Sequence, residues 1–156
     1  MLVFQYFEKI LIHEYVYNKE LDKNSKLYID EKIKINKAEI LTTPKQNIQY
    51  DSYLNELENH ELMRSFSRRK NAGEIHSIAY AKLYNIPYFS TNDGDATVAC
   101  KEIKTFNSVE VIGLEKLLII AEKTLDEDVA KNTRKIRRSM FKRRCRKNTT
   151  ADTYNK

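Results

Sequence analysis

The sequence predicts an α/β protein in which helices cover both faces of a central parallel sheet, a three-layer arrangement. Short apolar segments, typical of buried strands, alternate along the chain with longer segments whose apolar residues recur at helical spacing. This alternation is typical of parallel strands joined by crossover helices. The chain has 156 residues with only three Gly and two Pro, and no linker interrupts it. We therefore expect one main domain.

The elements follow one another in a regular order. Residues 10–12 are apolar and are expected to form a strand. Residues 14–21 are expected to form a helix, because Val16, Glu20 and Leu21 recur at helical spacing. The later segments are assigned in the same way: helices at residues 27–33, 51–66, 95–103 and 114–125, a helix that opens at Gly73 and Glu74, and strands at residues 38–42, 86–90 and 109–112.

Charge is divided unevenly along the chain. Residues 1–130 contain 17 Lys and Arg against 21 Asp and Glu, whereas residues 131–156 contain 11 against 1. We therefore separate an α/β domain at residues 1–128 from a basic extension at residues 129–156, which is partly helical or disordered. Such a segment attracts phosphate backbones by releasing counterions. The alternatives are a solvated end without a specific role and a weakly amphipathic helix for a protein partner or a membrane surface.

Acidic residues are expected to gather at one edge of the sheet. Glu74 opens a helix, and Asp93 and Asp95 follow the strand at residues 86–90. Ligands of open α/β sheets bind outside the carboxyl ends of the strands. Carboxylates that cluster there repel one another unless a hard cation lies between them, so Mg²⁺ or Mn²⁺ is the natural candidate. The plainer alternatives are a helix-dipole acid at Glu74 and turn or cap residues at Asp93 and Asp95.

The order of four segments resembles the PIN (PilT N-terminus) nuclease domain, which occurs in bacterial toxins and RNA-processing enzymes. The resemblance covers residues 4–118. Its segments are a strand and helix at residues 9–21 with an acid at Glu20, the helix start at Gly73 and Glu74, the strand end Thr91, Asn92 and Asp93, and the last strand and helix at residues 111–118.

The resemblance implies a metal-dependent ribonuclease of toxin type. Its catalytic and metal-binding residues would be Glu20, Glu74, Asp93 and Asp95, which would hold Mg²⁺ or Mn²⁺ while a metal-activated water attacks an RNA phosphodiester. Thr91 and Asn92 would orient ligands or water through hydrogen bonds. The expected partners are RNA and an antitoxin or another protein, with a homodimer left open.

The chain departs from the PIN pattern at its start. The family begins with a strand that carries the first catalytic Asp and lies at the centre of the sheet. Residues 1–7 look instead like the end of the following helix, and no Asp precedes Asp22. We expect a truncated product or start site, with little or no nuclease activity in the present chain. The alternative function is a catalytically silent PIN-like module that binds RNA or a protein partner.

The remaining side chains complete these expectations. Contacts to nucleic acid are assigned to basic residues before Gly73 and in the extension: Arg68, Arg69, Lys70, Arg134, Lys135, Arg137, Arg138, Lys142, Arg143 and Arg144. The three histidines, His13, His60 and His76, share no metal-binding spacing and are interpreted as structural or exposed. Cys100 and Cys145 show no zinc or disulfide pattern and are interpreted as reduced thiols. The apolar runs are too short to span a bilayer and no signal segment is recognised, so a cytoplasmic location is expected.

Overall fold

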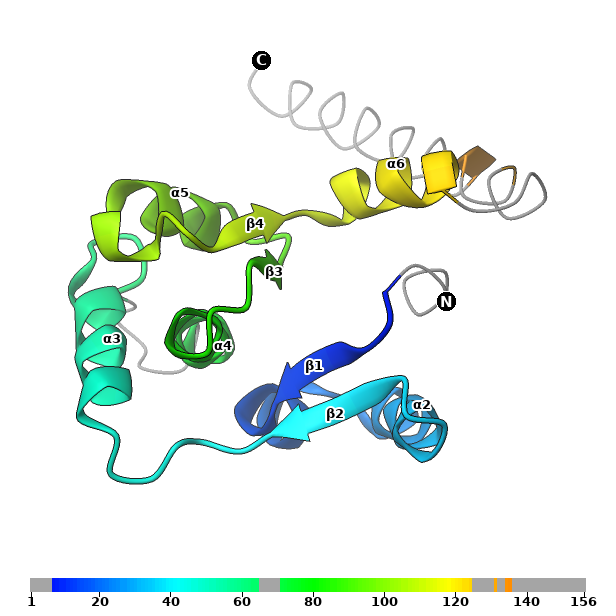
Figure 1. The fold of residues 1–156 in the computed structure, drawn as a ribbon, viewed down its shortest axis with the longest axis horizontal. Helices are drawn as coiled ribbons and strands as arrows, with labels where there is room; N and C mark the ends of the chain where they lie inside the picture. The colour runs from blue at the N-terminus through cyan, green and yellow to red at the C-terminus, as the bar shows by residue number, and fades with distance from the viewer. Residues whose placement is uncertain (1–6, 65–70, 125–130, 132–133, 136–156) are drawn as a thin grey trace, which may run out of the picture. The chain divides into compact units, whose positions relative to one another are not determined.

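The computed structural model describes residues 7–64, 71–124, 131, 134 and 135 (Figure 1). The chain divides into two compact units, Lys9–Gly113 and a second unit made of Met1–Glu8 and Leu114–Lys156. In the second unit, helix α6 spans Leu114–Thr124, with Leu117 and Leu118 buried. The expected domain boundary near residue 128 stays a prediction, because residues 125–130 lie outside the described residues.

The unit Lys9–Gly113 has a mixed α/β architecture. In chain order its elements are β1 (Ile10–His13), the π-helical segment η1 (Val16–Glu20), α2 (Lys23–Lys34), β2 (Ala38–Leu41), α3 (Ile48–Asn59), α4 (Ala72–Leu83), β3 (Tyr88–Ser90), α5 (Gly94–Glu102), the 3₁₀ turn η2 (Lys104–Phe106) and β4 (Glu110–Ile112). Every predicted strand and helix of this unit has a counterpart.

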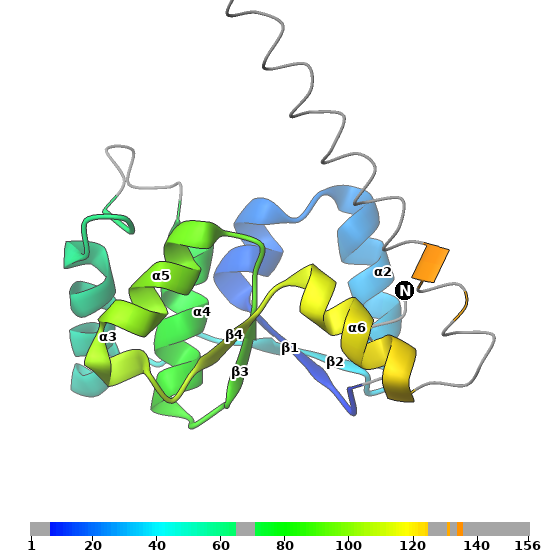
Figure 2. The ribbon, with the colours of Figure 1, turned by 90° about the horizontal axis from the view of Figure 1, so that it is seen from above.

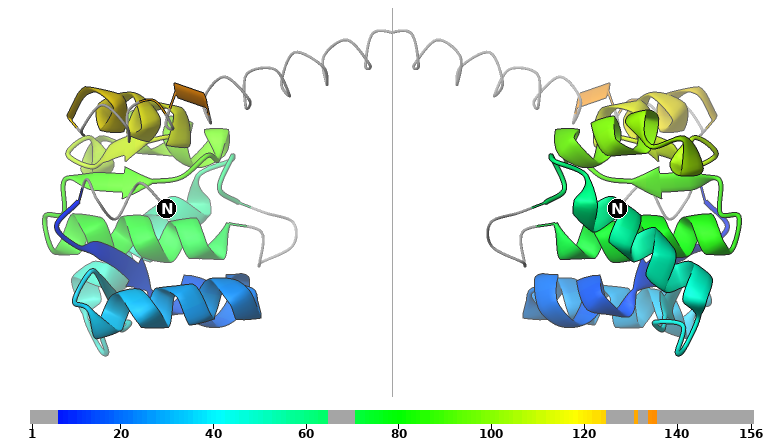
Figure 3. Two further views of the ribbon diagram at one scale, coloured as in Figure 1. Left: turned by 90° about the vertical axis from the view of Figure 1, so that its right-hand side faces the viewer. Right: turned by 90° about the vertical axis from the view of Figure 1, so that its left-hand side faces the viewer.

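The strands form two separate parallel pairs. β1 pairs with β2 in the register Ile10 to Ala38, and β3 pairs with β4 in the register Tyr88 to Glu110. Each pair is joined by helical segments, so each is a strand–helix–strand unit. The expected single central sheet is therefore replaced, in the described part of the chain, by two two-stranded sheets. Helix α4 contacts both β1 and β3 (Figure 3).

Asparagines end the two helices that lead directly into strands. Asn36 after α2 and Asn85 after α4 adopt the left-handed conformation, with φ of 55° and 53°. At the end of α4, the N–H of Ile86 donates to the carbonyl of Ala81 at 2.8 Å. After α2, the N–H of Lys37 donates to the carbonyl of Lys32 in the same way, at 2.8 Å. These Schellman ends satisfy the last helical carbonyls and turn the chain into β2 and β3.

Helix α3 is shorter than the sequence predicts. Its start is fixed by Asn47, whose side chain accepts a hydrogen bond from the N–H of Tyr50 at 3.0 Å. The helix was expected to continue to residue 66, but it ends at Asn59 because His60 turns to an extended conformation, with ψ of 132°. Phe66 lies outside the described residues. Apolar residues recur at helical spacing as far as Leu62, although the helical hydrogen bonds of α3 end at Asn59.

The core lies among α3, α4, α5 and η2 (Figure 2). Its largest fully buried side chains are Tyr50, Phe106, Leu57, Met63 and Ile78. Cys100 is a free thiol in this core, and burial raises its pKa to about 11; Cys145 lies outside the described residues. None of the helices in the described ranges is long and apolar enough to cross a membrane.

Candidate metal centre at the start of α4

The carboxylate of Glu20 rests on the backbone of Gly73. Glu20 is the last residue of η1, and Gly73 is the second residue of α4. The Gly73 N–H donates a hydrogen bond to the Glu20 carboxylate. A β-carbon at Gly73 would lie 2.6 Å from the Glu20 carboxyl carbon, far inside van der Waals contact. The close approach therefore requires glycine at this position.

Glu20 and Glu74 are close enough to interact electrostatically. Burial against α4 raises the pKa of the Glu20 carboxyl, the charge of Glu74 raises that pKa further, and the hydrogen bond from Gly73 opposes both effects. Much of Glu20 stays open to solvent, so the part that loses water is the carboxylate end against Gly73. Two of the four predicted carboxylates are thus brought together from separate segments. The charge of one carboxylate disfavours the charged form of the other.

Thr91 connects Glu74 to Asp93. The Thr91 hydroxyl donates to Oε1 of Glu74 at 3.5 Å, the outer limit for such a bond, and accepts from the N–H of Asp93 at 3.1 Å. The orienting role expected for Thr91 stays a prediction. The Oδ1 of Asn92 would lie 3.8 Å from a β-carbon at Gly113.

Asp93 is the N-cap of α5. Its Oδ1 accepts a hydrogen bond from the N–H of Asp95 at 2.8 Å, and its carbonyl accepts from the Thr97 hydroxyl at 3.0 Å. Asp95 lies in the first turn of the same helix. The plainer interpretation of Asp93 as a cap is therefore correct, and it leaves open whether the carboxylate also binds a metal. In the described ranges, no three Asp, Glu, His or Cys side chains are grouped so that they could hold a metal ion.

The basic residues assigned to nucleic acid are only partly described. Arg134 and Lys135 are exposed. Arg68, Arg69, Lys70, Arg137, Arg138, Lys142, Arg143 and Arg144 lie outside the described residues. Their assignment stays a prediction.

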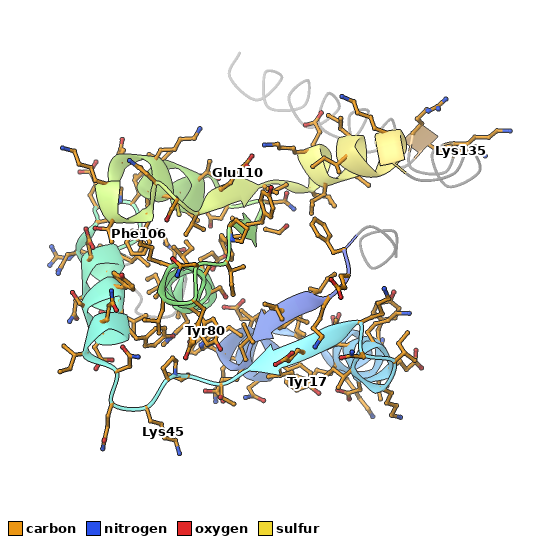
Figure 4. The ribbon with its side chains drawn as sticks, in the orientation of Figure 1. Tyr17, Lys45, Tyr80, Phe106, Glu110 and Lys135 are labelled. Carbon is orange, nitrogen blue, oxygen red and sulfur yellow. The ribbon has the colours of Figure 1, made fainter. Side chains whose placement is uncertain are left out.

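A partly buried cluster of histidines and tyrosines was not foreseen. The Tyr50 hydroxyl lies 3.2 Å from Nε2 of His13 and 2.9 Å from Nδ1 of His76. The rings of His13 and His76 stack with centroids 5.1 Å apart, and the Tyr15 ring stacks on His76 at 5.1 Å. Tyr80 projects from α4 toward β1 (Figure 4), where its ring meets His13 edge-on at 5.9 Å. These residues share no sequence spacing, so no pattern could have found them.

Burial lowers the pKa of both histidines of this cluster. His13 is 2% exposed, and burial lowers its pKa to about 4; the neighbouring His76 lowers it as well, while Glu14 opposes the shift. Burial also lowers the pKa of His76. His60 lies apart and pairs with Glu102 at 3.0 Å.

Comparison with family models, with curated proteins and with solved structures finds no match to this chain.

Proposed function

We propose that this chain is a metal-dependent ribonuclease of the PIN type, which hydrolyses RNA phosphodiester bonds with Mg²⁺ or Mn²⁺. The observation that supports this proposal is the meeting of Glu20 and Glu74 at Gly73. Glu20 is partly desolvated beside the charge of Glu74, and it is held there by a backbone contact that only glycine allows. A divalent cation would relieve the repulsion.

The donor set fits a hard cation that retains water. Mg²⁺ is commonly bound by one or two carboxylates, with waters and substrate phosphate oxygens as its other ligands. Glu20 and Glu74 would be the protein ligands, and the Thr91 hydroxyl would orient Glu74. Asp93, whose backbone N–H bonds to Thr91, would act only through a water held by the cation. A bound cation would supply charge stabilisation and a water of lowered pKa.

The chain's own residues prepare this arrangement. The Gly73 N–H holds the Glu20 carboxylate, and the Thr91 hydroxyl reaches Glu74. Glu74 also lies in the first turn of α4, where the helix dipole favours negative charge.

Metal binding tests the proposal more directly than turnover, since we expect the present chain to cleave weakly. Titration with Mn²⁺, followed by calorimetry, should detect a site in the wild-type chain that Glu74→Gln weakens at least about tenfold, because that change removes one of two charged ligands. Glu31→Gln, which removes the same charge from the exposed face of α2, is the matched control and should leave the affinity unchanged. Cleavage of single-stranded RNA should follow the same order of variants.

Equal Mn²⁺ affinity in the wild-type, Glu74→Gln and Glu31→Gln chains would overturn the assignment. Metal-independent RNA cleavage would do the same.

A second candidate is a PIN-like module that binds RNA without cutting it. It rests on the charge of residues 131–156, with 11 basic residues against one acid, of which Lys131, Arg134 and Lys135 are exposed in the described part. Binding that persists in EDTA, with intact RNA recovered after incubation with Mn²⁺, would favour this module over the ribonuclease. An antitoxin or other protein partner and a homodimer stay predictions.

A further inference from the structure

We propose that Tyr50 is a positioning residue for the Glu20 and Glu74 pair, because its hydroxyl fixes the segment that carries Glu20 against the helix that carries Glu74. This inference rests on the proposed function only in naming the pair as metal ligands. The contacts that support it are those among His13, Tyr15, Tyr50 and His76, of which His13 and Tyr50 are buried.

Helix α4 and η1 touch at two places. At one end, Gly73 of α4 receives the carboxylate of Glu20, the last residue of η1. At the other end, the His76 ring of α4 stacks on Tyr15, which immediately precedes η1. Since η1 is only five residues long, a shift at Tyr15 is carried along the segment to Glu20.

The hydrogen bonds of the cluster run in one direction. The N–H of Tyr15 donates to Nδ1 of His13 at 3.1 Å, so a neutral His13 carries its proton on Nε2. That Nε2–H donates to the Tyr50 hydroxyl at 3.2 Å. The hydroxyl proton is then directed to Nδ1 of His76 at 2.9 Å, which is shorter than its other acceptor distance, 3.4 Å to the His76 carbonyl. His76 therefore also carries its proton on Nε2.

A single hydroxyl thus satisfies one buried ring, His13, and one half-buried ring, His76. Tyr50 is fully buried and His13 nearly so, so bulk water does not replace a partner that His13 loses. Without the hydroxyl, Nε2–H of His13 loses its acceptor and Nδ1 of His76 loses its donor. The stacked rings can then shift, and with them the Tyr15 end of η1.

The Gly73 amide reports on this coupling without metal or RNA. Gly73 is the second residue of α4, where an N–H has no carbonyl partner within the helix. Its protection from hydrogen exchange therefore depends on the Glu20 carboxylate.

The test compares Tyr50→Phe with Tyr53→Phe in the metal-free full chain. Tyr53 also lies on α3, and its hydroxyl accepts only an exposed hydrogen bond from Gln49, at 2.7 Å, among the contacts described for it. Tyr50→Phe should speed exchange of the Gly73 amide by about 3- to 10-fold, the change expected for one weakened hydrogen bond. The ¹⁵N shifts of the His13 and His76 rings should move away from the Nε2–H pattern. Tyr53→Phe should change neither signal.

Mn²⁺ affinity is the second readout and should fall by about 3- to 10-fold in Tyr50→Phe alone. Unchanged Gly73 exchange in a folded Tyr50→Phe chain would overturn the inference, as would an equal effect of Tyr53→Phe. A wild-type chain that shows the Gly73 coupling but binds no Mn²⁺ would overturn the proposed function and leave the positioning role of Tyr50 intact.

Discussion

Gly73→Ala should separate the stability of the fold from the integrity of the site. The new methyl would lie 2.6 Å from the carboxyl carbon of Glu20, so one of the two must move. Glu20 is exposed and its carboxylate is the free end of a flexible side chain, so rotation of that side chain removes the clash at little cost. The backbone of α4 has no reason to shift.

The stability terms of this change nearly cancel. Alanine within a helix is favoured over glycine by about 0.5–1 kcal/mol. The lost hydrogen bond between Gly73 and Glu20 is partly replaced by water, and a typical net contribution of such a bond is about 0.5–1.5 kcal/mol. The free energy of unfolding should therefore change by less than about 1 kcal/mol. Mn²⁺ affinity should nevertheless fall at least about tenfold, because one of two carboxylate ligands is displaced.

Urea denaturation and Mn²⁺ titration of the same variant measure the two effects. Gly94→Ala is the matched control: it lies in the first turn of α5, and a β-carbon there meets nothing within 4 Å. It should raise the free energy of unfolding by no more than about 1 kcal/mol and leave the Mn²⁺ affinity near its wild-type value. A loss of more than about 2 kcal/mol in Gly73→Ala would show that Glu20 cannot rotate away. Unchanged Mn²⁺ affinity would refute the place of Glu20 in the site.

Three further predictions concern other parts of the chain. The pKa of His13 is lowered to about 4 in the folded chain, so the unfolded chain binds more protons below pH 6.5. The free energy of unfolding should therefore fall by about 3 kcal/mol between pH 6.5 and 4. Denaturation at several pH values measures this change, and a free energy that does not vary with pH would contradict it. Asp93→Ala should cost about 1 kcal/mol by removing the α5 cap, whereas Asp93→Asn should keep the cap and stability but weaken Mn²⁺ binding; equal urea midpoints for both variants would argue against the cap. Deletion of residues 131–156 removes 11 positive charges and, if about five contact phosphate, should flatten the plot of log affinity against log salt by roughly 3.5 units on single-stranded RNA; identical slopes for the full-length and truncated chains would exclude this role for the extension.

The local elements were predictable because their signals are local. The Asn residues after α2 and α4 and the acids before α5 act through neighbours within a few positions, so their sequence context is sufficient. The meeting of Glu20 with Glu74 was expected only from the resemblance of the whole chain to a known topology. The sequence shows that residue 73 has no β-carbon. It does not show that the Glu20 carboxylate occupies the space where a β-carbon would lie.

Other features depend on contacts between distant residues. The relation of Tyr50 to His13 and His76 spans 37 and 26 positions, and each residue alone fits an ordinary core or surface position. The end of α3 at Asn59 was missed because the apolar spacing continues through Leu62 while the backbone has already turned at His60. Division of the strands into two pairs is a tertiary property that strand propensities do not report.

Burial differs sharply between residues 9–47 and the helices that follow, and this difference places the two site carboxylates in regions of unequal local stability. Within residues 9–47, only His13 and Ala38 are buried, and α2 buries no residue at all. The core cluster belongs to α3, α4, α5 and η2. Segments with few buried contacts open locally at lower free energy than the core. Glu20 therefore belongs to the region that opens first, and Glu74 to the region that opens last. A ligand that bridges them would bind only the closed form, and would slow hydrogen exchange throughout β1, α2 and β2 while leaving the core amides almost unchanged.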